Sequence, residues 1–347
     1  MRASALAVLL GLVVLAVPAA AAVDPAVVQA RYDAARDREE ALLRARPVDR
    51  REVAVVRAAI LEVERIDHRP RGWAGGRDVP RTALPAGSMR ARAPAGVDSG
   101  LEARLAALGR GYGGWAAFWV HDLVSGRVAG WNSDARFPAA STVKLAVLAA
   151  ALRAIAVSPG RSPHWYDLRQ LTGWSSNLAA NRLYAWLGSA RLASALRGLG
   201  MWSSTYPGPY RAGTATADAP KPPPVDTWRY TTARDLGRAL YALQAAAAGN
   251  RYQQRQTGLS RGRARLALEL LLASWKGGDN AGLVQPFVGE APVAQKNGWI
   301  SDARLTAAIV YAKTGPRIVV VLVYRPKLLY REAQSLGRRV LTLARVP

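Results

Sequence analysis

Strand-like segments stand at both ends of the C-terminal part of this chain, and helical segments fill the interval between them. Residues 115–123 (WAAFWVHDL) and 127–133 (RVAGWNS) are expected to form two strands, joined into a hairpin at Ser125-Gly126. Near the C-terminus, the runs VAQKNGW, LTAAIVYA and IVVVLVY predict three more strands, and a helix follows them. This order predicts an α+β domain in which both ends of the domain build one antiparallel sheet that packs against a helical region.

The segments before this domain differ from it in composition. The first residues carry one arginine, an apolar run and a small-residue end, which is typical of a secretory signal peptide cut near Ala22. Because the run is short for a membrane span, an uncut anchor is the alternative. We expect a secreted or cell-envelope protein. It divides into a signal peptide, a charged helical segment, a linker rich in Pro, Gly and Arg, and the domain itself: residues 1–22, 23–68, 69–100 and 101–347.

The composition argues against several kinds of site. The chain has no cysteine, so it has neither a disulfide nor a thiol nucleophile. Its three histidines have no ligand spacing, which argues against a histidine zinc site and a Ser-His-Asp triad. The net charge is +24, but the arginines are spread along the chain without a basic block. We therefore expect no nucleic-acid partner, and attraction to an anionic cell envelope is the alternative meaning of the charge.

Lysine is rare in this chain. Of its 48 basic residues only six are lysines, at positions 144, 221, 276, 296, 313 and 327, and the others are arginines. Arginine stays protonated in proteins, whereas a buried lysine can lose its proton and act as a base. The few lysines are therefore the first positions to consider for chemistry.

The sequence FPAASTVKLAV places Ser141 and Lys144 at the start of an apolar helix. A spacing of three residues is just under one helical turn, so both side chains lie on the same face. A hydroxyl nucleophile needs a base within hydrogen-bond reach, and a partly buried lysine can be that base. Backbone N–H groups at a helix start also suit a developing oxyanion. The alternative is that Ser141 caps the helix and Lys144 is a surface residue.

Two further motifs follow. Ser175, Ser176 and Asn177 open another helix, where simple capping is the alternative role. Later come two lysine triplets, 296–298 (KNG) and 313–315 (KTG). The second lies between apolar strand runs beside Gly-Pro, which predicts a solvated hairpin tip. The first begins inside a strand-like run, where a glycine lets a substrate approach the backbone, so we assign the function to Lys296.

Together these motifs, Ser141-x-x-Lys144, Ser175-x-Asn177 and Lys296-x-Gly298, resemble those of the class A β-lactamases and their penicillin-binding relatives. The likeness extends from about Leu101 to the C-terminus and includes the hairpin before the nucleophile helix. It also includes YTTARDLGRAL, which resembles the helix after the family's active-site loop. The resemblance implies the β-lactamase/DD-peptidase fold, and no metal or organic cofactor.

The resemblance also implies roles for the matched residues. Ser141 attacks the substrate carbonyl and becomes acylated, Lys144 is a candidate base, and Ser175 passes a proton to the leaving nitrogen. The remaining matched positions are assigned to substrate binding: Asn177, Lys296, Asn297, Gly298 and Trp299. Among these, Lys296 holds the substrate carboxylate, and the backbone N–H of Trp299 forms an oxyanion hole with that of Ser141.

Some positions depart from the family pattern. Ser176 stands where class A enzymes usually have aspartate, and Asn297 replaces the usual Thr or Ser, so an amide contact is expected in place of a hydroxyl contact. The segment between Lys144 and Ser175 is shorter than in the family, which reduces one wall of the site.

The largest departure concerns deacylation. The family's active-site loop has a glutamate that activates the deacylating water, but here no glutamate occurs between Glu102 and Glu269. Asp218 and Asp226 are the only acids near the expected loop. The resulting hypothesis is a monomeric, secreted class A β-lactamase-like hydrolase with slow deacylation. The alternatives are a D-alanyl-D-alanine carboxypeptidase acting on peptidoglycan stem peptides, and a non-catalytic cell-wall binding relative.

Overall fold

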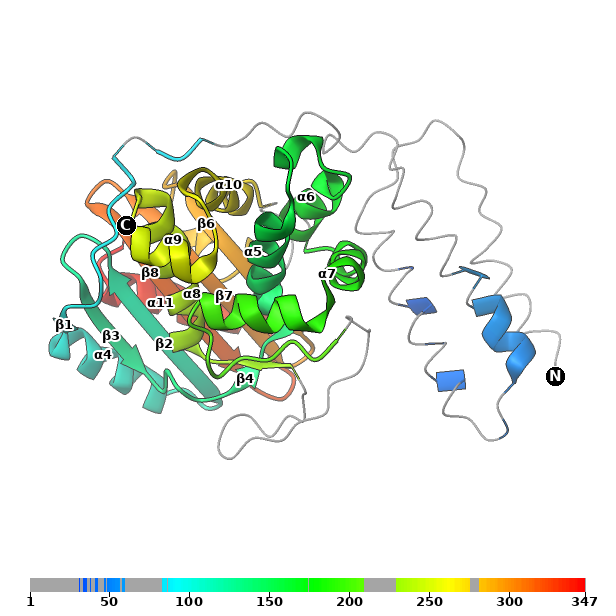
Figure 1. The fold of residues 1–347 in the computed structure, drawn as a ribbon. Coiled ribbons are helices and arrows are strands. Elements are labelled where there is room, and N and C mark those ends of the chain that lie inside the picture. Colours follow the sequence, from blue (N-terminus) through cyan, green and yellow to red (C-terminus); the bar gives the residue numbers. More distant parts are fainter. Residues whose placement is uncertain are drawn as a thin grey trace. The chain divides into compact units, whose positions relative to one another are not determined.

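A six-stranded sheet crosses the domain in the order β1-β3-β2-β8-β7-β6 (Figure 1). A separate two-stranded sheet pairs β4 with β5. The strands are β1 Gly96–Val97, β2 Trp115–Asp122, β3 Arg127–Trp131, β4 Phe137–Pro138, β5 Tyr230–Thr231, β6 Val293–Ile300, β7 Ala303–Ala312 and β8 Gly315–Tyr324. The structure is a computed structural model, and it describes residues 83–85, 87–173, 175–208, 229–274 and 281–346, with part of residues 31–59.

The two ends of the domain meet in the middle of the large sheet. The predicted hairpin is confirmed, because β2 and β3 pair antiparallel with Phe118 opposite Trp131. The three predicted C-terminal strands are also confirmed, and they pair antiparallel in sequence. β8 then pairs antiparallel with β2 along the whole length of β2, from Trp115 opposite Tyr324 to Asp122 opposite Arg317.

The sheet has one more strand than the sequence predicted. β1 pairs parallel with β3, and the Ala95 N–H donates to the Gly126 carbonyl at 2.8 Å. The segment before β1 is held as well, because the side-chain amide of Gln244 donates to the Ser88 carbonyl at 2.6 Å. The C-terminal end of the expected linker 69–100 is therefore paired with the domain, and the first helix of the domain begins at Ser99.

Helices cover both faces of the large sheet (Figure 1). α4 and α11 lie on one face and enclose a hydrophobic core with β2, β3, β7 and β8. On the other face α8 packs against β2, β7 and β8, and α10 packs against β6. The helices are α4 Ser99–Arg110, α5 Lys144–Ala154, α6 Trp165–Gly173, α7 Asn177–Gly198, α8 Ala233–Ala248, α9 Arg251–Thr257, α10 Arg261–Leu272 and α11 Tyr330–Leu343, with short 3₁₀ helices η1 Ala140–Val143, η2 Pro159–Arg161 and η4 Gln285–Phe287.

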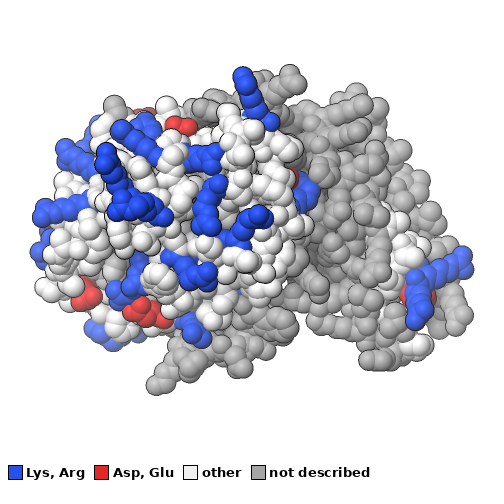
Figure 2. All heavy atoms as spheres, viewed as in Figure 1, with Lys and Arg blue, Asp and Glu red and all other residues white. Residues whose placement is uncertain are grey.

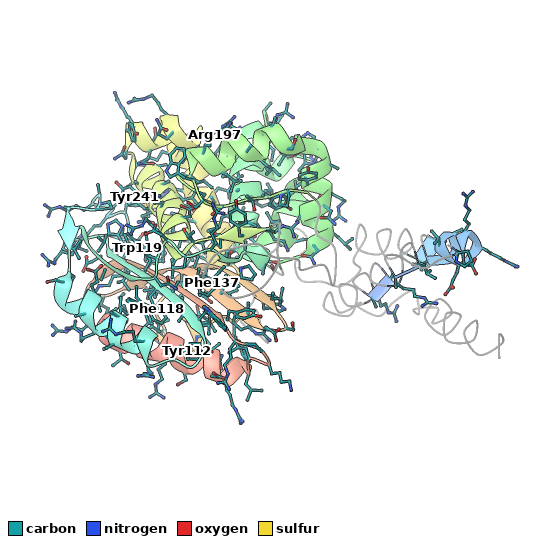
Figure 3. All side chains as sticks on the ribbon, turned by 90° about the horizontal axis from the view of Figure 1, so that it is seen from below. Tyr112, Phe118, Trp119, Phe137, Arg197 and Tyr241 are labelled. Atoms are coloured by element: carbon teal, nitrogen blue, oxygen red, sulfur yellow. The ribbon has the colours of Figure 1, made fainter. Side chains whose placement is uncertain are left out.

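Neighbouring residues of β2 show how the two faces differ. Side chains alternate along a strand, so Phe118 enters the core beside α4 and α11, while Trp119 faces α8 (Figure 3). A Cβ on Gly237 of α8 would lie 2.2 Å from the Trp119 ring, so only glycine allows this helix to pack so closely. The Arg234 guanidinium lies over the same ring, 4.8 Å from its centroid.

The chain divides into two units, residues 80–209 with 215–347 and residues 1–79 with 210–214. In the second of these, described residues on both sides of Pro47 are helical, and the Asp49 carboxylate caps the later helix by accepting from the Glu52 N–H at 3.0 Å. No helix in the described part of the chain is long and apolar enough to cross a membrane. On the visible face of the larger unit, basic side chains lie in separate groups and acidic ones are few (Figure 2).

Candidate active site

The predicted nucleophile stands on a strained turn. Ser141 lies in η1 and is partly exposed, and α5 continues from it with Lys144. Ala140, directly before Ser141, has a φ of +43°, which places an ordinary L-residue in the left-handed region. Such a conformation costs on the order of 1–3 kcal/mol and persists only where surrounding contacts impose it. The strain fixes the direction in which the Ser141 side chain leaves the turn.

Lys144 is fully buried, not a surface residue. Its ammonium donates to the Ser175 carbonyl and, at 2.7 Å, to Oδ1 of Asn177. The expected hydrogen bond to Ser141 is not among those that the described residues make. Catalytic hydrogen bonds are often long in structures without substrate and tighten when it binds, so the role of Lys144 as the base stays a prediction.

Ser175 lies between the two buried lysines. Its carbonyl accepts from Lys144, and its Oγ accepts from Nζ of Lys296 at 2.6 Å. Its φ is +62°, a second strained position among these residues. Ser175 and Asn177 are therefore occupied with the lysines and do not act as simple helix caps.

Capping is done by the residue between them. Ser176 is the N-cap of α7, and its Oγ accepts from the Ala179 N–H at 3.1 Å. Serine and aspartate are both good N-caps. This explains how Ser176 can stand where the related enzymes usually have aspartate without disturbing the motif.

Lys296 is held in a site that disfavours its charge. It is 2% exposed, and burial lowers its pKa to about 7. Apart from Ser175, it donates to the Asn297 carbonyl at 2.9 Å. An ammonium with so few partners would gain from an anion, because a hydrogen bond between charged groups is stronger than one between neutral groups.

Gly298 brings Lys296 and the nucleophile turn together. A Cβ on Gly298 would lie 2.9 Å from the Ser141 nitrogen and 3.1 Å from the Ala139 carbonyl oxygen. β6 therefore passes directly beside η1, as the sequence predicted for a close backbone approach. The Ser141 N–H lies in the first helical turn, where N–H groups lack partners within the helix. Trp299 is the next residue of β6 and is partly buried, which is compatible with the expected oxyanion hole.

The structure does not support the expected substrate contact of Asn297. Side chains alternate along β6, so Asn297 faces away from Lys296. Its Oδ1 accepts from the hydroxyl of its cross-strand partner Thr306 at 2.7 Å, and Thr306 accepts from the Leu283 N–H at 2.8 Å. The Asn297 amide is 1% exposed. It secures the sheet, and only its backbone carbonyl reaches the lysine.

The second lysine triplet, residues 313–315, lies at a hairpin tip, as the sequence predicted. Lys313 and Thr314 form the exposed turn between β7 and β8, and Gly315 opens β8 with a φ of +119°. The acids that the sequence offered as substitutes for the missing glutamate, Asp218 and Asp226, lie outside the described residues.

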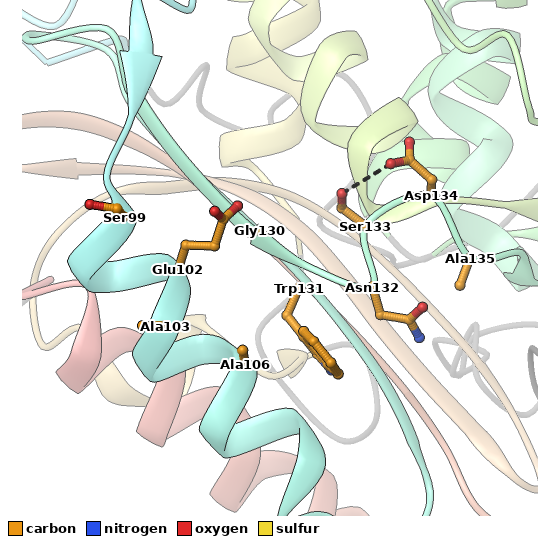
Figure 4. Close-up of a pocket in the computed structure, with 10 residues that line it drawn as sticks. All are labelled: Ser99, Glu102, Ala103, Ala106, Gly130, Trp131, Asn132, Ser133, Asp134 and Ala135. Carbon is orange, nitrogen blue, oxygen red and sulfur yellow. Dashed lines mark hydrogen bonds between the residues drawn. The ribbon is translucent and has the colours of Figure 1, made fainter.

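One hollow of the structure lies apart from these residues. It has a volume of about 540 Å³ and is open, and it lies between α4 and the loop after β3 (Figure 4). Trp131 and small residues such as Ala103 and Ala106 line it. None of the predicted site residues lines this hollow, so it does not change the assignment of the site.

The structure thus brings four predicted residues into one hydrogen-bonded group: Lys144, Ser175, Asn177 and Lys296. A fifth, Ser141, lies beside this group. Two buried lysines hold one serine between them, which suits proton transfer near an anion. Two contributors were not predicted: the strained backbone at Ala140 and the Thr306 support of β6. An alanine with positive φ has no sequence signal, and the Thr306 contact depends on a register that only the folded sheet reveals.

Comparisons with known proteins identify the family and the fold. The family model described as the beta-lactamase enzyme family matches residues 100–158 and 156–343. A beta-lactamase from Sphaerobacter thermophilus is similar in structure, with a TM-score of 0.56 and 20% identity over 71% of this chain and 95% of that one. PBP-A is similar too, with a TM-score of 0.55 and 20% identity over 72% and 97% of the two chains. A beta-lactamase from Desulfarculus baarsii is also similar, with a TM-score of 0.53 and 21% identity over 70% of this chain and 96% of that one. A search of curated proteins found no match.

Proposed function

The chain belongs to the beta-lactamase enzyme family, and from this premise we propose that it is a secreted serine hydrolase that opens β-lactams through an acyl-enzyme on Ser141. Its fold is that of β-lactamases and DD-peptidases. The observation that carries the proposal is the position of Ser175 between the buried Lys144 and Lys296. A PBP-A variant with a similar fold was solved as an acyl-enzyme complex with penicillin-G, which makes penicillin the natural probe.

In the proposed reaction, Ser141 Oγ attacks the lactam carbonyl while Lys144, in its neutral amine form, takes the proton of the hydroxyl. The oxyanion that forms is stabilised by backbone N–H groups, of which that of Ser141 is the best placed. Ser175 then gives its proton to the lactam nitrogen as the carbon–nitrogen bond breaks, and it receives in exchange the proton that Lys144 took from Ser141. Lys296 supports Ser175 and attracts the carboxylate of the substrate. The product is an ester on Ser141 with the ring opened.

Covalent labelling by a fluorescent penicillin tests the nucleophile. The wild-type chain should become labelled, and the Ser141→Ala variant should not, because it lacks the attacking oxygen. Ser141 is partly exposed, so this change should leave the fold intact, which circular dichroism can verify. Labelling that persists in Ser141→Ala would refute the assignment, and an unlabelled wild type would favour a non-catalytic binding relative.

We expect the ester to be hydrolysed slowly. A positioned general base contributes about 10²–10⁴-fold to a rate, and no glutamate is available between Glu102 and Glu269. Mass spectrometry after mixing with penicillin should therefore find an adduct that lasts for minutes. Rapid turnover of the wild type with no adduct would contradict the expectation, and loss of that turnover in Asp218→Asn or Asp226→Asn would then identify the substitute base.

The missing glutamate also favours a second candidate, a D-alanyl-D-alanine peptidase. Such an enzyme uses the same nucleophile chemistry and is trapped by penicillin as a lasting ester. Release of D-alanine from a peptide that ends in D-Ala-D-Ala, measured beside hydrolysis of penicillin and cephalosporin, separates the two candidates. The faster of the reactions identifies the substrate.

A further inference from the structure

A buried carboxylate far from the lysines is linked to the turn that carries Ser141. Asp235 lies in the first turn of α8 and is 1% exposed. Its Oδ2 accepts from the Ser203 N–H at 2.7 Å and from the Ser204 hydroxyl at 2.8 Å, while Arg238 lies 3.6 Å from Oδ1. Burying a carboxylate is costly unless hydrogen bonds compensate for lost water, and burial raises the pKa of Asp235.

These contacts join two segments that are distant in sequence. The Ser204 hydroxyl also contacts the Thr231 hydroxyl at 2.8 Å, and the Thr205 N–H donates to the Tyr230 carbonyl at 2.9 Å. A little further out, the Arg229 guanidinium donates to the Gly208 carbonyl at 2.8 Å. Asp235 is therefore the buried end of a set of hydrogen bonds that holds residues 203–208 against residues 229–231.

The second of these segments reaches the nucleophile turn directly. Thr231 of β5 pairs with Phe137 of β4, and the Arg229 carbonyl accepts from the Ala139 N–H at 2.9 Å. The Ala139 carbonyl in turn accepts from the backbone N–H and the hydroxyl of Thr142, at 3.0 and 2.6 Å. Ala140 and Ser141 stand between Ala139 and Thr142, so the pairing holds the first residue of the strained turn directly, and the last residue is bonded to the first.

We propose that Asp235 is a positioning residue for acylation: by fastening residues 203–204 to the start of α8, it holds β5 against β4 and so keeps Ser141 in its orientation after the strained Ala140. Strained backbone relaxes when the contacts that impose it are lost. A displacement of about 1 Å can cost about 10²-fold in rate without any loss of binding contacts. The inference rests on the proposed function, because it concerns the rate of the same acylation.

The test compares Asp235→Ala with Thr232→Ala in the full chain. Thr232 is the N-cap of the same helix, and its hydroxyl accepts from the Asp235 N–H at 3.1 Å, so its loss weakens α8 without cutting the bridge to Ser204. In stopped-flow acylation by penicillin, Asp235→Ala should lower the limiting rate constant by about 10- to 100-fold, with the dissociation constant of the first complex within about twofold. Thr232→Ala should change neither by more than about twofold, and Asp235→Asn, which keeps an acceptor oxygen, should recover most of the rate.

A helix-stabilising role alone predicts equal losses in Asp235→Ala and Thr232→Ala, and that result would overturn the proposal. So would an unchanged rate in Asp235→Ala. Amide hydrogen exchange gives a second readout that needs no activity. The Ala139 N–H should exchange at least about tenfold faster in Asp235→Ala than in Thr232→Ala. If the wild type is not acylated at all, the proposed function fails, and the exchange rates still decide whether Asp235 holds the turn.

Discussion

Two lysines stand in similar triplets near the C-terminus, and their surroundings are opposite. Lys296 lies inside β6, is 2% exposed and donates to Ser175 at 2.6 Å. Lys313 lies in the turn between β7 and β8 and is exposed to solvent. Only the second triplet has the complete Lys-Thr-Gly sequence, yet only the first places its lysine against Ser175. Burial and neighbours, more than the letters of the motif, decide which lysine is chemically useful.

The largest expected difference between the two lysines is in acylation. Lys296→Ala removes the only described side chain that donates to Ser175 Oγ, together with a charge aimed at the substrate's anion. Removing one such electrostatic partner costs on the order of 10²–10³-fold in rate. Rate constants for acylation by penicillin, measured by stopped flow, should fall by this factor. A loss of less than about tenfold would contradict the assignment of Lys296.

The low pKa of Lys296 should make the binding of penicillin depend on pH. Because burial lowers the pKa of Lys296 to about 7, its ammonium is present below pH 7 and is lost above it. Affinity of the first complex for an anionic penicillin should therefore fall by about tenfold between pH 6 and pH 8. In Lys296→Arg the guanidinium stays charged, so this variant should show no such fall. A flat wild-type profile, or the same fall in the variant, would show that another group is responsible.

A smaller loss of acylation rate is expected from a change on the opposite face of β6, at Asn297. Asn297→Ala removes the acceptor for the buried Thr306 hydroxyl, and leaving such a group unsatisfied costs about 1–3 kcal/mol of stability. Urea denaturation should register this loss, while acylation should slow by no more than about threefold because the amide faces away from Ser175. A large fall in the acylation rate with little loss of stability would instead support the contact between Asn297 and the substrate that the sequence suggested.

The smallest effect is expected at the hairpin tip. Lys313→Ala removes an exposed charge, and surface substitutions of this kind usually change stability by less than about 0.5 kcal/mol. Acylation rate and urea midpoint should both stay close to those of the wild type. A loss of acylation comparable to that of Lys296→Ala would mean that the two triplets have been assigned in the wrong order.

The sequence was most informative where a local pattern decides the structure. Alternating and apolar runs located β2, β3, β6, β7 and β8, and Gly-Pro marked the turn at Lys313. Where a residue depends on partners far along the chain, local patterns carried no information. The direction of Asn297 follows from its register with Thr306, and β1 forms only because β3 offers an unpaired edge.

The same limit applies to the site itself. Ser141, Lys144, Ser175 and Lys296 were predicted from motif spacing, since each motif lies within one helical turn or one strand segment, and the structure brings them close together. The positive φ values at Ala140 and Ser175 have no signature in sequence, because neither residue is glycine. The contacts beside Ala140 also lie beyond local sequence patterns, because the pairing of β4 with β5 joins residues more than ninety positions apart.

A crystal structure of the protein after reaction with penicillin tests the central claim most directly. The account predicts continuous density from Ser141 Oγ to the opened ring, with the carboxylate of the ligand on the side of Lys296 and Ser175 and with Lys313 far from it. Density for an ester on another residue, or a carboxylate held by Lys313, would contradict it.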